Sequence, residues 1–242
     1  MPTFGGIPIT TRHDMLTRQA IHSGAYLENF ESLPDLWSRE RIEAYLAETM
    51  RDRPADATDV WILAYGSLIW NPTVIMASKQ AATLHDWQRS FCLRMVVGRG
   101  SPDKPGRMLA LEAGGHTDGV ALKLSEDTVN EELLLVWIRE MVLGSYLPKW
   151  APVTFRDGAR THALAFVADT TRDQFEPDSS VPTVAPFIAS ASGNFGTNVE
   201  YLHKLHASLE AHGLQDPYID ALSNATKQFQ LKPACDLRGV HE

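Results

Sequence analysis

The fold is decided by residues 60–72, which read VWILAYGSLIWNP. The unbroken apolar run at 60–65 has the length of a buried strand, and Gly66 and Ser67 interrupt it, so the stretch predicts a buried strand that ends in a tight turn. Because glycine has no Cβ, Gly66 permits positive φ or a close approach of the backbone, and the N–H groups of residues 66–68 can then point into one concavity. Such a concavity binds an anion or a developing oxyanion. The alternative is a glycine that only lets the chain turn.

The composition favours a packed globular protein with a small-molecule partner. The 242 residues carry a formal net charge of −8 and are 44% hydrophobic, which argues against nucleic acid as a partner because phosphate binding needs clustered Lys and Arg. Cys92 and Cys235 lie outside any CxxC spacing, which fits a reducing compartment and offers no thiolate metal site. Residues 1–11 lack the pattern of a secretion signal, and no apolar stretch approaches the roughly 20 residues that span a bilayer. We therefore expect a cytoplasmic protein without a membrane segment.

Residues 1–57 predict an N-terminal helical extension that precedes a main domain at residues 58–242. One short helix is expected at about residues 12–22. A second is expected at about residues 35–51, where apolar side chains recur at helical spacing and Pro34 stands near the start. The pattern does not decide whether the extension covers a binding site, mediates association or adds core, and it leaves the oligomeric state open.

Much of the sequence between residues 60 and 168 has the pattern of β-strands. Alternating side chains predict a strand at 90–97, and two short strands at 108–111 and 120–124 are expected to be separated by a turn at Gly114-Gly115. Asp157-Gly158 is a hairpin signal between two further strands, because glycine takes positive φ at little cost. The strands predict a meander or a barrel and, together with the helices, an α+β fold.

Several helices are marked by their caps. Thr128 and Thr197 each precede a glutamate by three positions, which is the spacing of a capping box, and Gly144 and Gly213 stand where the two helices should end. Residues 193–196 between the later helices predict a flexible loop. Helices are expected at residues 128–143, 181–190, about 197–212, and from Asp216-Pro217 onward.

Glu140 is an anomaly in the helix at 128–143. It follows Trp137 by three positions, so it lies on or beside the apolar stripe, whereas Arg139 and Glu132 are expected to project elsewhere. A carboxylate drawn toward the core binds its proton more tightly, which is how a general base is made. The alternative is a glutamate at the edge of the stripe that reaches water or pairs with a nearby arginine.

Other candidates for chemistry carry weaker signals. Ser67 is a possible nucleophile, but GxSxG is absent and no His or Asp partner can be assigned to it. His203 and His206 have a spacing that can chelate a metal, but no third ligand is indicated. Gly98-Arg99-Gly100 lacks the rest of a dinucleotide fingerprint and is interpreted as a loop.

Three spaced motifs make the chain similar to a known family. They are YGSL at 65–68, REMVLGSY at 139–146 and GTNVEYL at 196–202, and GLQDPY at 213–218 accompanies them. In this order they resemble the ChaC-type γ-glutamylcyclotransferases, which act on glutathione. The resemblance covers about residues 60–225 and leaves the extension unmatched. One departure is Ser145, which stands where family members often have glycine and adds a Cβ there.

The resemblance implies a γ-glutamylcyclotransferase-like fold, a small mixed β-barrel flanked by helices. It also implies the reaction, in which the α-amine of the γ-glutamyl group attacks its own side-chain carbonyl, forms 5-oxoproline and releases Cys-Gly. Neither a metal nor a cofactor is implied. Two alternatives remain open: the same ring closure on another γ-glutamyl amine or peptide, and a non-catalytic binding protein on the same fold.

The resemblance also assigns site residues. Glu140 matches the family's catalytic glutamate and would act as general acid and base. The residues that match its substrate-binding turn are Tyr65, Gly66, Ser67 and Leu68. Tyr146 and Tyr201 fall where family tyrosines line the pocket.

Overall fold

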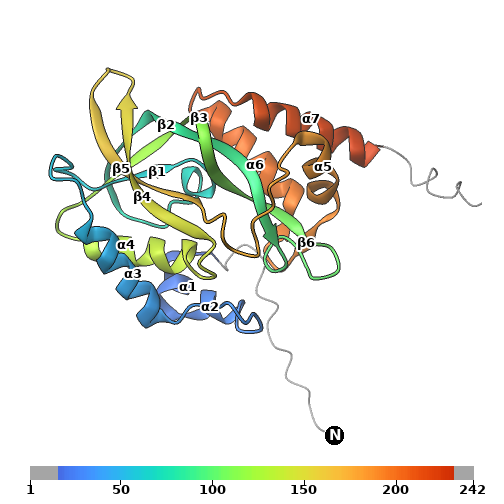
Figure 1. Cartoon of the computed structure of the whole chain (residues 1–242), viewed down its shortest axis with the longest axis horizontal. Helices are drawn as coiled ribbons and strands as arrows, with labels where there is room; N and C mark the ends of the chain where they lie inside the picture. The colour runs from blue at the N-terminus through green and yellow to red at the C-terminus, as the bar shows by residue number, and fades with distance from the viewer. Residues whose placement is uncertain (1–15, 232–242) are drawn as a thin grey trace, which may run out of the picture.

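The computed structural model describes residues 16–231, which form a closed, mixed β-barrel flanked by helices (Figure 1). The order of strands around the barrel is β1-β3-β2-β4-β5, and the parallel pair β1–β5 closes it through Ile62 and Leu164. All other neighbouring pairs in the barrel are antiparallel. The strands are β1 (Trp61–Ala64), β2 (Met76–Met95), β3 (Gly106–Leu124), β4 (Tyr146–Phe155) and β5 (Arg160–Ala168). The predicted barrel and its mixed character are confirmed.

β1 is the strand that the opening apolar run predicts. Each of its residues is at most 6% exposed, because β3 and β5 flank it and side chains cover both of its faces. A strand buried on both faces has no solvent side to mark by alternation, which explains the continuous apolar pattern. The strand ends where the chain turns into the short 3₁₀ helix η1 (Ser67–Ile69).

The prediction of two short strands at 108–111 and 120–124 is wrong. β3 runs without a break from Gly106 to Leu124 and pairs with β2, which is of similar length and also begins well before the predicted residue 90. Gly114 and Gly115, with φ of 116° and 64°, lie opposite Asp86 in a β-bulge. Glycines at positive φ inside a strand bend it without ending it, which is why a turn signal marks a bulge here.

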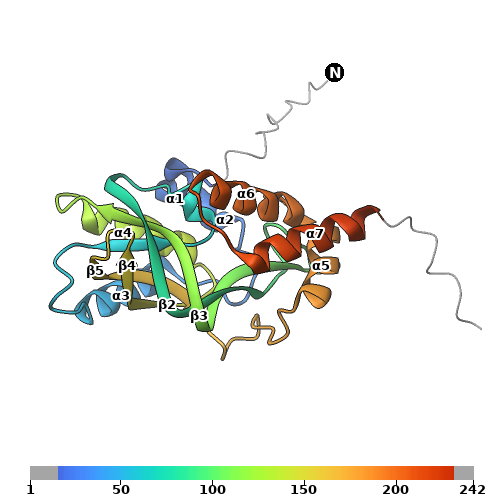
Figure 2. The same cartoon turned by 90° about the horizontal axis from the view of Figure 1, so that it is seen from above.

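The helices gather on two sides of the barrel (Figures 1 and 2). In both views α3 and α4 lie on one side, and α5, α6 and α7 lie together on another. The helices are α1 (Arg18–Ser23), α2 (Ala25–Glu28), α3 (Arg39–Arg51), α4 (Val129–Glu140), α5 (Val181–Ser190), α6 (Asn198–Ala211) and α7 (Pro217–Leu231). The two-residue strands β6 (Ser192–Gly193) and β7 (Gly196–Thr197) form a hairpin where a flexible loop was predicted. None of the helices within 16–231 is long and apolar enough to cross a membrane.

The predicted helix caps have different outcomes. The Thr197 hydroxyl accepts a hydrogen bond from the amide of Glu200 at 3.0 Å, as a capping box requires. Thr128 makes no such bond, and its buried hydroxyl has no partner among the described residues. Gly144, at φ 62°, does follow α4, but the helix itself ends at Glu140. The indole of Trp37 occupies the space that a Cβ at Gly144 would need.

The N-terminal segment, residues 16–57, packs on α4 through α1 and α3. The helix predicted at 35–51 is confirmed as α3, and the helix predicted at about 12–22 begins at Arg18, its first residues lying outside the described range. The amide of Trp37 donates to the carbonyl of Val142 at 2.9 Å, and the indole of Trp150 donates to the carbonyl of Thr49 at 2.9 Å. The segment therefore covers the side of α4 that the barrel leaves uncovered.

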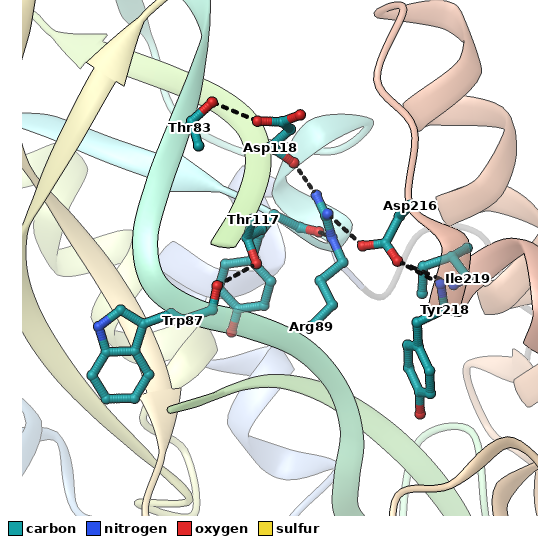
Figure 3. A network of polar contacts seen from close by, with 9 residues as sticks. Thr83, Trp87, Arg89, Thr117, Asp118, Asp216, Tyr218 and Ile219 are labelled. Carbon is teal, nitrogen blue, oxygen red and sulfur yellow. Dashed lines mark hydrogen bonds and ion pairs between the residues drawn. The ribbon is translucent and has the colours of Figure 1, made fainter. Parts of the chain in front are cut away.

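A buried guanidinium joins the barrel to α7 (Figure 3). Arg89 in β2 has a side chain that is 1% exposed, and it donates to Asp216 Oδ2 at 2.8 Å and to the carbonyl of Tyr65 at 2.8 Å. It also donates to the carbonyl of Asp118. Asp216 in turn accepts from the amides at the start of α7, as its predicted role as helix cap requires. One side chain thus fixes the end of β1 against the C-terminal helix.

We expect Arg89→Met to lower the free energy of unfolding by about 3–5 kcal/mol, because the Asp216 carboxylate would be left without its buried partner. Urea unfolding followed by circular dichroism measures the change. Arg160→Met is the matched control, since Arg160 is exposed in β5 and its loss is expected to change stability by less than about 0.5 kcal/mol. Equal losses in the two variants would contradict a structural role for Arg89.

Candidate functional site

A cavity of about 920 Å³ opens where β1 ends and α4 terminates. The predicted site residues come from four separate parts of the chain, and the structure brings all of them to its wall. They are Tyr65, Gly66, Ser67, Leu68, Glu140, Tyr146 and Tyr201. A cavity of this size, with polar groups converging on it, is typical of a small-molecule site.

The turn after β1, whose residues line this cavity, has backbone donors without an acceptor in the described part of the chain. Because η1 begins at Ser67, the amides of Gly66, Ser67 and Leu68 precede the first hydrogen bond of the turn, and within residues 16–231 no acceptor is paired with them. Gly66 has φ −130°, so positive φ is not the reason for glycine here. A Cβ at Gly66 would lie 3.1 Å from the Tyr201 hydroxyl and 3.2 Å from a methyl group of Leu109. Close approach is therefore the constraint, and the amides are available to an anion.

Glu140 is the last residue of α4 and lines the cavity. Its side chain is 16% exposed, and burial raises the pKa of its carboxyl above the ordinary value. The Arg139 guanidinium, whose Nε lies 3.0 Å from Glu140 Oε1, opposes that rise. The carboxylate is thus kept partly desolvated and paired with one cation, and it can accept and return a proton.

Arg139 links Glu140 to the turn, which the sequence did not predict. Its side chain is 3% exposed and donates to Ser67 Oγ at 2.7 Å and to the carbonyl of Asn71. The expectation that Arg139 and Glu132 project away from the core is wrong, since Glu132 is fully buried as well. The reason is that the N-terminal segment covers the second side of α4, so the helix is buried nearly all round.

Three tyrosines line the same cavity as the carboxylate. The hydroxyl of Tyr65 donates to the carbonyl of Phe166 at 2.6 Å, and that of Tyr146 donates to the carbonyl of Leu109 at 2.9 Å. Burial raises the pKa of Tyr201 to about 12 and those of Tyr65 and Tyr146 well above the ordinary value, and the negative charge of Glu140 adds to each shift. The phenols therefore stay protonated at neutral pH and act as neutral hydrogen-bonding groups.

The N-terminal segment forms one wall of the cavity, and this is also new relative to the sequence. The hydroxyl of Tyr26 donates to the carbonyl of Arg139 at 3.2 Å, and its ring stacks on Phe195 with centroids 6.1 Å apart. Arg18 binds the buried carboxylate of Glu132 through both of its terminal nitrogens. Residues of the segment that line the cavity are Leu16, Thr17, Arg18, Tyr26, Phe30, Leu33, Pro34 and Asp35. Tyr26 and Phe30 follow no motif that a single sequence reveals.

The weaker candidates do not form a second centre. No histidine is among the described residues that line the cavity, so Ser67 has no imidazole base there. Its hydroxyl instead accepts from Arg139. His206 Nε2 lies 3.0 Å from Asp220 Oδ1 on α7, and within 16–231 no group of three His, Cys, Asp or Glu side chains is placed to hold a metal ion.

Comparison with known proteins gives consistent matches. A family model described as ChaC-like protein matches residues 60–229. The glutathione-specific gamma-glutamylcyclotransferase of Escherichia coli K12 is 42% identical over 217 residues, covering 89% of this chain and 94% of the relative. The glutathione-specific gamma-glutamylcyclotransferase 1 of mouse is 32% identical over 177 residues, covering 70% of this chain and 79% of the relative.

The structural comparison concerns the fold. The crystal structure of a γ-glutamyl cyclotransferase specific to glutathione from yeast superposes with a TM-score of 0.63 at 20% identity, covering 72% of this chain and all of that one. The bacterial relative matches more residues than lie between 60 and the C-terminus, so its similarity includes part of the N-terminal segment. Part of the sequence of that segment is therefore similar in the two proteins.

We expect Arg139→Met to raise the pKa of the Glu140 carboxyl above its value in the unmodified protein, because the positive charge that opposes desolvation is lost. ¹³C NMR titration of labelled glutamate carboxyls measures the pKa, and the signal missing in Glu140→Gln assigns the resonance. Arg139→Lys is the control, since it keeps the charge and should give a smaller rise. An unchanged or lower midpoint in a folded Arg139→Met protein would contradict this account of the site.

Proposed function

Because the chain belongs to the ChaC-like protein family, whose model spans residues 60–229, we propose that it is a glutathione-specific γ-glutamylcyclotransferase. One observation carries the proposal: Glu140, a carboxyl with a raised pKa, shares a cavity with the amides of residues 66–68, for which residues 16–231 provide no acceptor. The relatives in E. coli and mouse bear the name of this activity, which supports the substrate. The proposed localisation is cytoplasmic.

In the proposed reaction the γ-glutamyl α-amine of glutathione attacks the carbonyl carbon of its own side-chain amide. A C–N bond forms within a five-membered ring, the amide C–N bond to cysteine breaks, and 5-oxoproline and Cys-Gly are the products. The amine is protonated near neutral pH, so a base must remove a proton, and the departing amine must gain one. Both reacting groups belong to one molecule, so holding it in a ring-closing geometry is a large part of catalysis.

Glu140 is proposed to carry both proton transfers. Its raised pKa brings the affinity of the carboxylate for a proton closer to that of a general base operating near neutral pH. The same group can then hand the proton to the leaving nitrogen. Arg139 keeps the carboxylate oriented from the side of the turn.

The turn is proposed to bind the anionic part of the γ-glutamyl half. Its residues line the cavity next to Tyr201, and the Ser67 hydroxyl is bound by Arg139. The amides and this hydroxyl can serve the α-carboxylate or the oxyanion of the tetrahedral intermediate, and either use requires donors that are already in place before the substrate arrives. Tyr65, Tyr146 and Tyr201 complete the proposed substrate pocket as neutral phenols.

We propose a corresponding division of the chain. Residues 58–242 form the γ-glutamylcyclotransferase-like domain that supplies Glu140 and the turn. Residues 1–57 form an extension whose described part covers α4 and closes one wall of the cavity. Closing this wall removes water from around Glu140, which strengthens the electrostatic interactions in the site.

We expect Glu140→Gln to bind glutathione but to lose at least about two orders of magnitude in kcat, because an acid/base group is removed without a change of shape. Assay of 5-oxoproline and Cys-Gly measures turnover. Since the folded-state pKa of Glu140 is raised, folding disfavours the ionised carboxylate at neutral pH, and the variant should unfold at the same or a higher temperature. A turnover near that of the unmodified enzyme would refute the assigned role.

Ser67→Ala separates this reaction from hydrolysis through a serine nucleophile. We expect it to reduce kcat by less than Glu140→Gln does, because the hydroxyl is proposed to bind rather than to react. Mass spectrometry of the enzyme quenched during turnover tests for an acyl group on Ser67. Complete loss of activity together with a trapped acyl-enzyme in the unmodified protein would favour the serine mechanism.

A further inference from the structure

Arg99 presents an unused hydrogen-bonding edge to the cavity. It belongs to the loop at 96–105 between β2 and β3, and its side chain is 14% exposed. Nη1 donates to the carbonyl of Thr197 at 2.8 Å and to Glu200 Oε2 at 3.4 Å. For Nε and Nη2 the described part of the chain supplies no acceptor, and neither atom is fully enclosed. A guanidinium edge with two parallel N–H donors matches a carboxylate.

The surroundings of Arg99 carry a net positive charge. Glu200 is shared, since its Oε1 binds Lys204 Nζ at 2.8 Å while its Oε2 faces Arg99. Two cations therefore compete for one carboxylate, and all three side chains line the cavity. The chain as a whole has a net charge of −8, so a local excess of positive charge here favours an anionic ligand group.

Among the other arginines that line the cavity, Arg94 is exposed, whereas Arg139 and Arg18 are already engaged. Arg139 binds Ser67, Asn71 and Glu140, and Arg18 binds Glu132 through two bonds. Neither of them offers a free pair of donors to a second carboxylate. Arg99 differs in this respect and is held in place, because its neighbour Gly98 is bonded to the β6–β7 hairpin on both its amide and its carbonyl.

Arg99 lies one aromatic ring away from the turn. Its guanidinium carbon is 5.6 Å from the ring centroid of Tyr201, whose hydroxyl reaches Gly66. The leaving part of the substrate is two residues long, which spans at most about 7 Å when extended. A γ-glutamyl tripeptide held at the turn can therefore reach Arg99 with its C-terminus.

We propose that Arg99, aided by Lys204, binds the C-terminal carboxylate of the leaving dipeptide and thereby selects γ-glutamyl peptides with a free C-terminus. The inference deepens the proposed function and rests on it. Glutathione has two carboxylates, and the turn accounts for the γ-glutamyl half alone. Recognition of the second carboxylate separates glutathione from γ-glutamyl amines that share only the first half.

The test compares glutathione with its C-terminal amide, in which the glycine carboxylate is replaced by CONH₂. We expect kcat/KM for the amide to be lower by about 10- to 100-fold, mainly through KM, as the loss of a charged hydrogen-bonded pair implies. In Arg99→Met, kcat/KM for glutathione should fall to the value for the amide, while kcat/KM for the amide should change little. Methionine keeps an aliphatic side chain over Tyr201. Structural damage would lower kcat/KM for both substrates alike, so the ratio of the two kcat/KM values reports recognition of the carboxylate.

Arg94→Met is the matched control, because Arg94 also lines the cavity but is exposed. It should keep the preference for the free acid. Equal kcat/KM for acid and amide in the unmodified enzyme, or loss of the preference in Arg94→Met and not in Arg99→Met, would overturn the inference. Formation of 5-oxoproline from both substrates at equal rates would leave the proposed function standing, whereas no 5-oxoproline from either would remove the proposed function itself.

Discussion

The arrangement of the site depends on one buried guanidinium, that of Arg139. A charge enclosed in protein is costly unless its hydrogen bonds are satisfied, and Arg139 meets this requirement by binding Glu140 on one side and the turn, through Ser67 and Asn71, on the other. The same bonds fix the position of the proposed base relative to the amides of residues 66–68, which are proposed to bind an anion. They also explain how a desolvated carboxylate is tolerated: the cation opposes the rise in its pKa without bringing it back to the ordinary value.

Arg139 and Glu140 are buried because α4 is covered on two sides. The barrel covers one side of α4, and the N-terminal segment covers the other through Trp37 and Tyr26, which bind carbonyls at the end of the helix. Water is thereby kept from a large part of the helix, so both Arg139 and the more distant Glu132 need partners within the protein. Arg18 supplies one of these partners from the segment itself. Stability of the segment and electrostatics of the site are thus coupled through α4.

Local patterns predicted β-strands in a meander or barrel, most of the helices and the unusual position of Glu140, because an apolar run, a capping residue and a carboxylate beside an apolar stripe each act within a few residues. The grouping of Glu140 with the turn, Tyr146 and Tyr201 came from the family resemblance, since these residues are distant in sequence. The bulge at Gly114 was mistaken for a turn, since glycine permits positive φ in both settings and only the partner strand distinguishes them. Arg139 was misplaced for a different reason. A helical pattern shows one buried face, whereas burial on the second face comes from a segment about a hundred residues earlier in the sequence. The role proposed for Arg99 has no local signal, because the groups that bind it come from β7 and α6.

The two halves of the proposed substrate make different demands on the fold. Ring closure needs the base and the anion-binding amides at fixed positions, and these belong to rigid elements, the end of α4 and the turn after β1, that Arg139 ties together. The leaving half takes no part in forming the ring and needs only to be recognised, so its proposed contacts fall on a loop and on the exposed side of α6. The sequences of loops vary more readily among related proteins than those of such rigid elements do. A change of leaving group can therefore arise at Arg99 and Lys204 without disturbing Glu140, which makes the loop at 96–105 and α6 the proposed place where substrate preference is set.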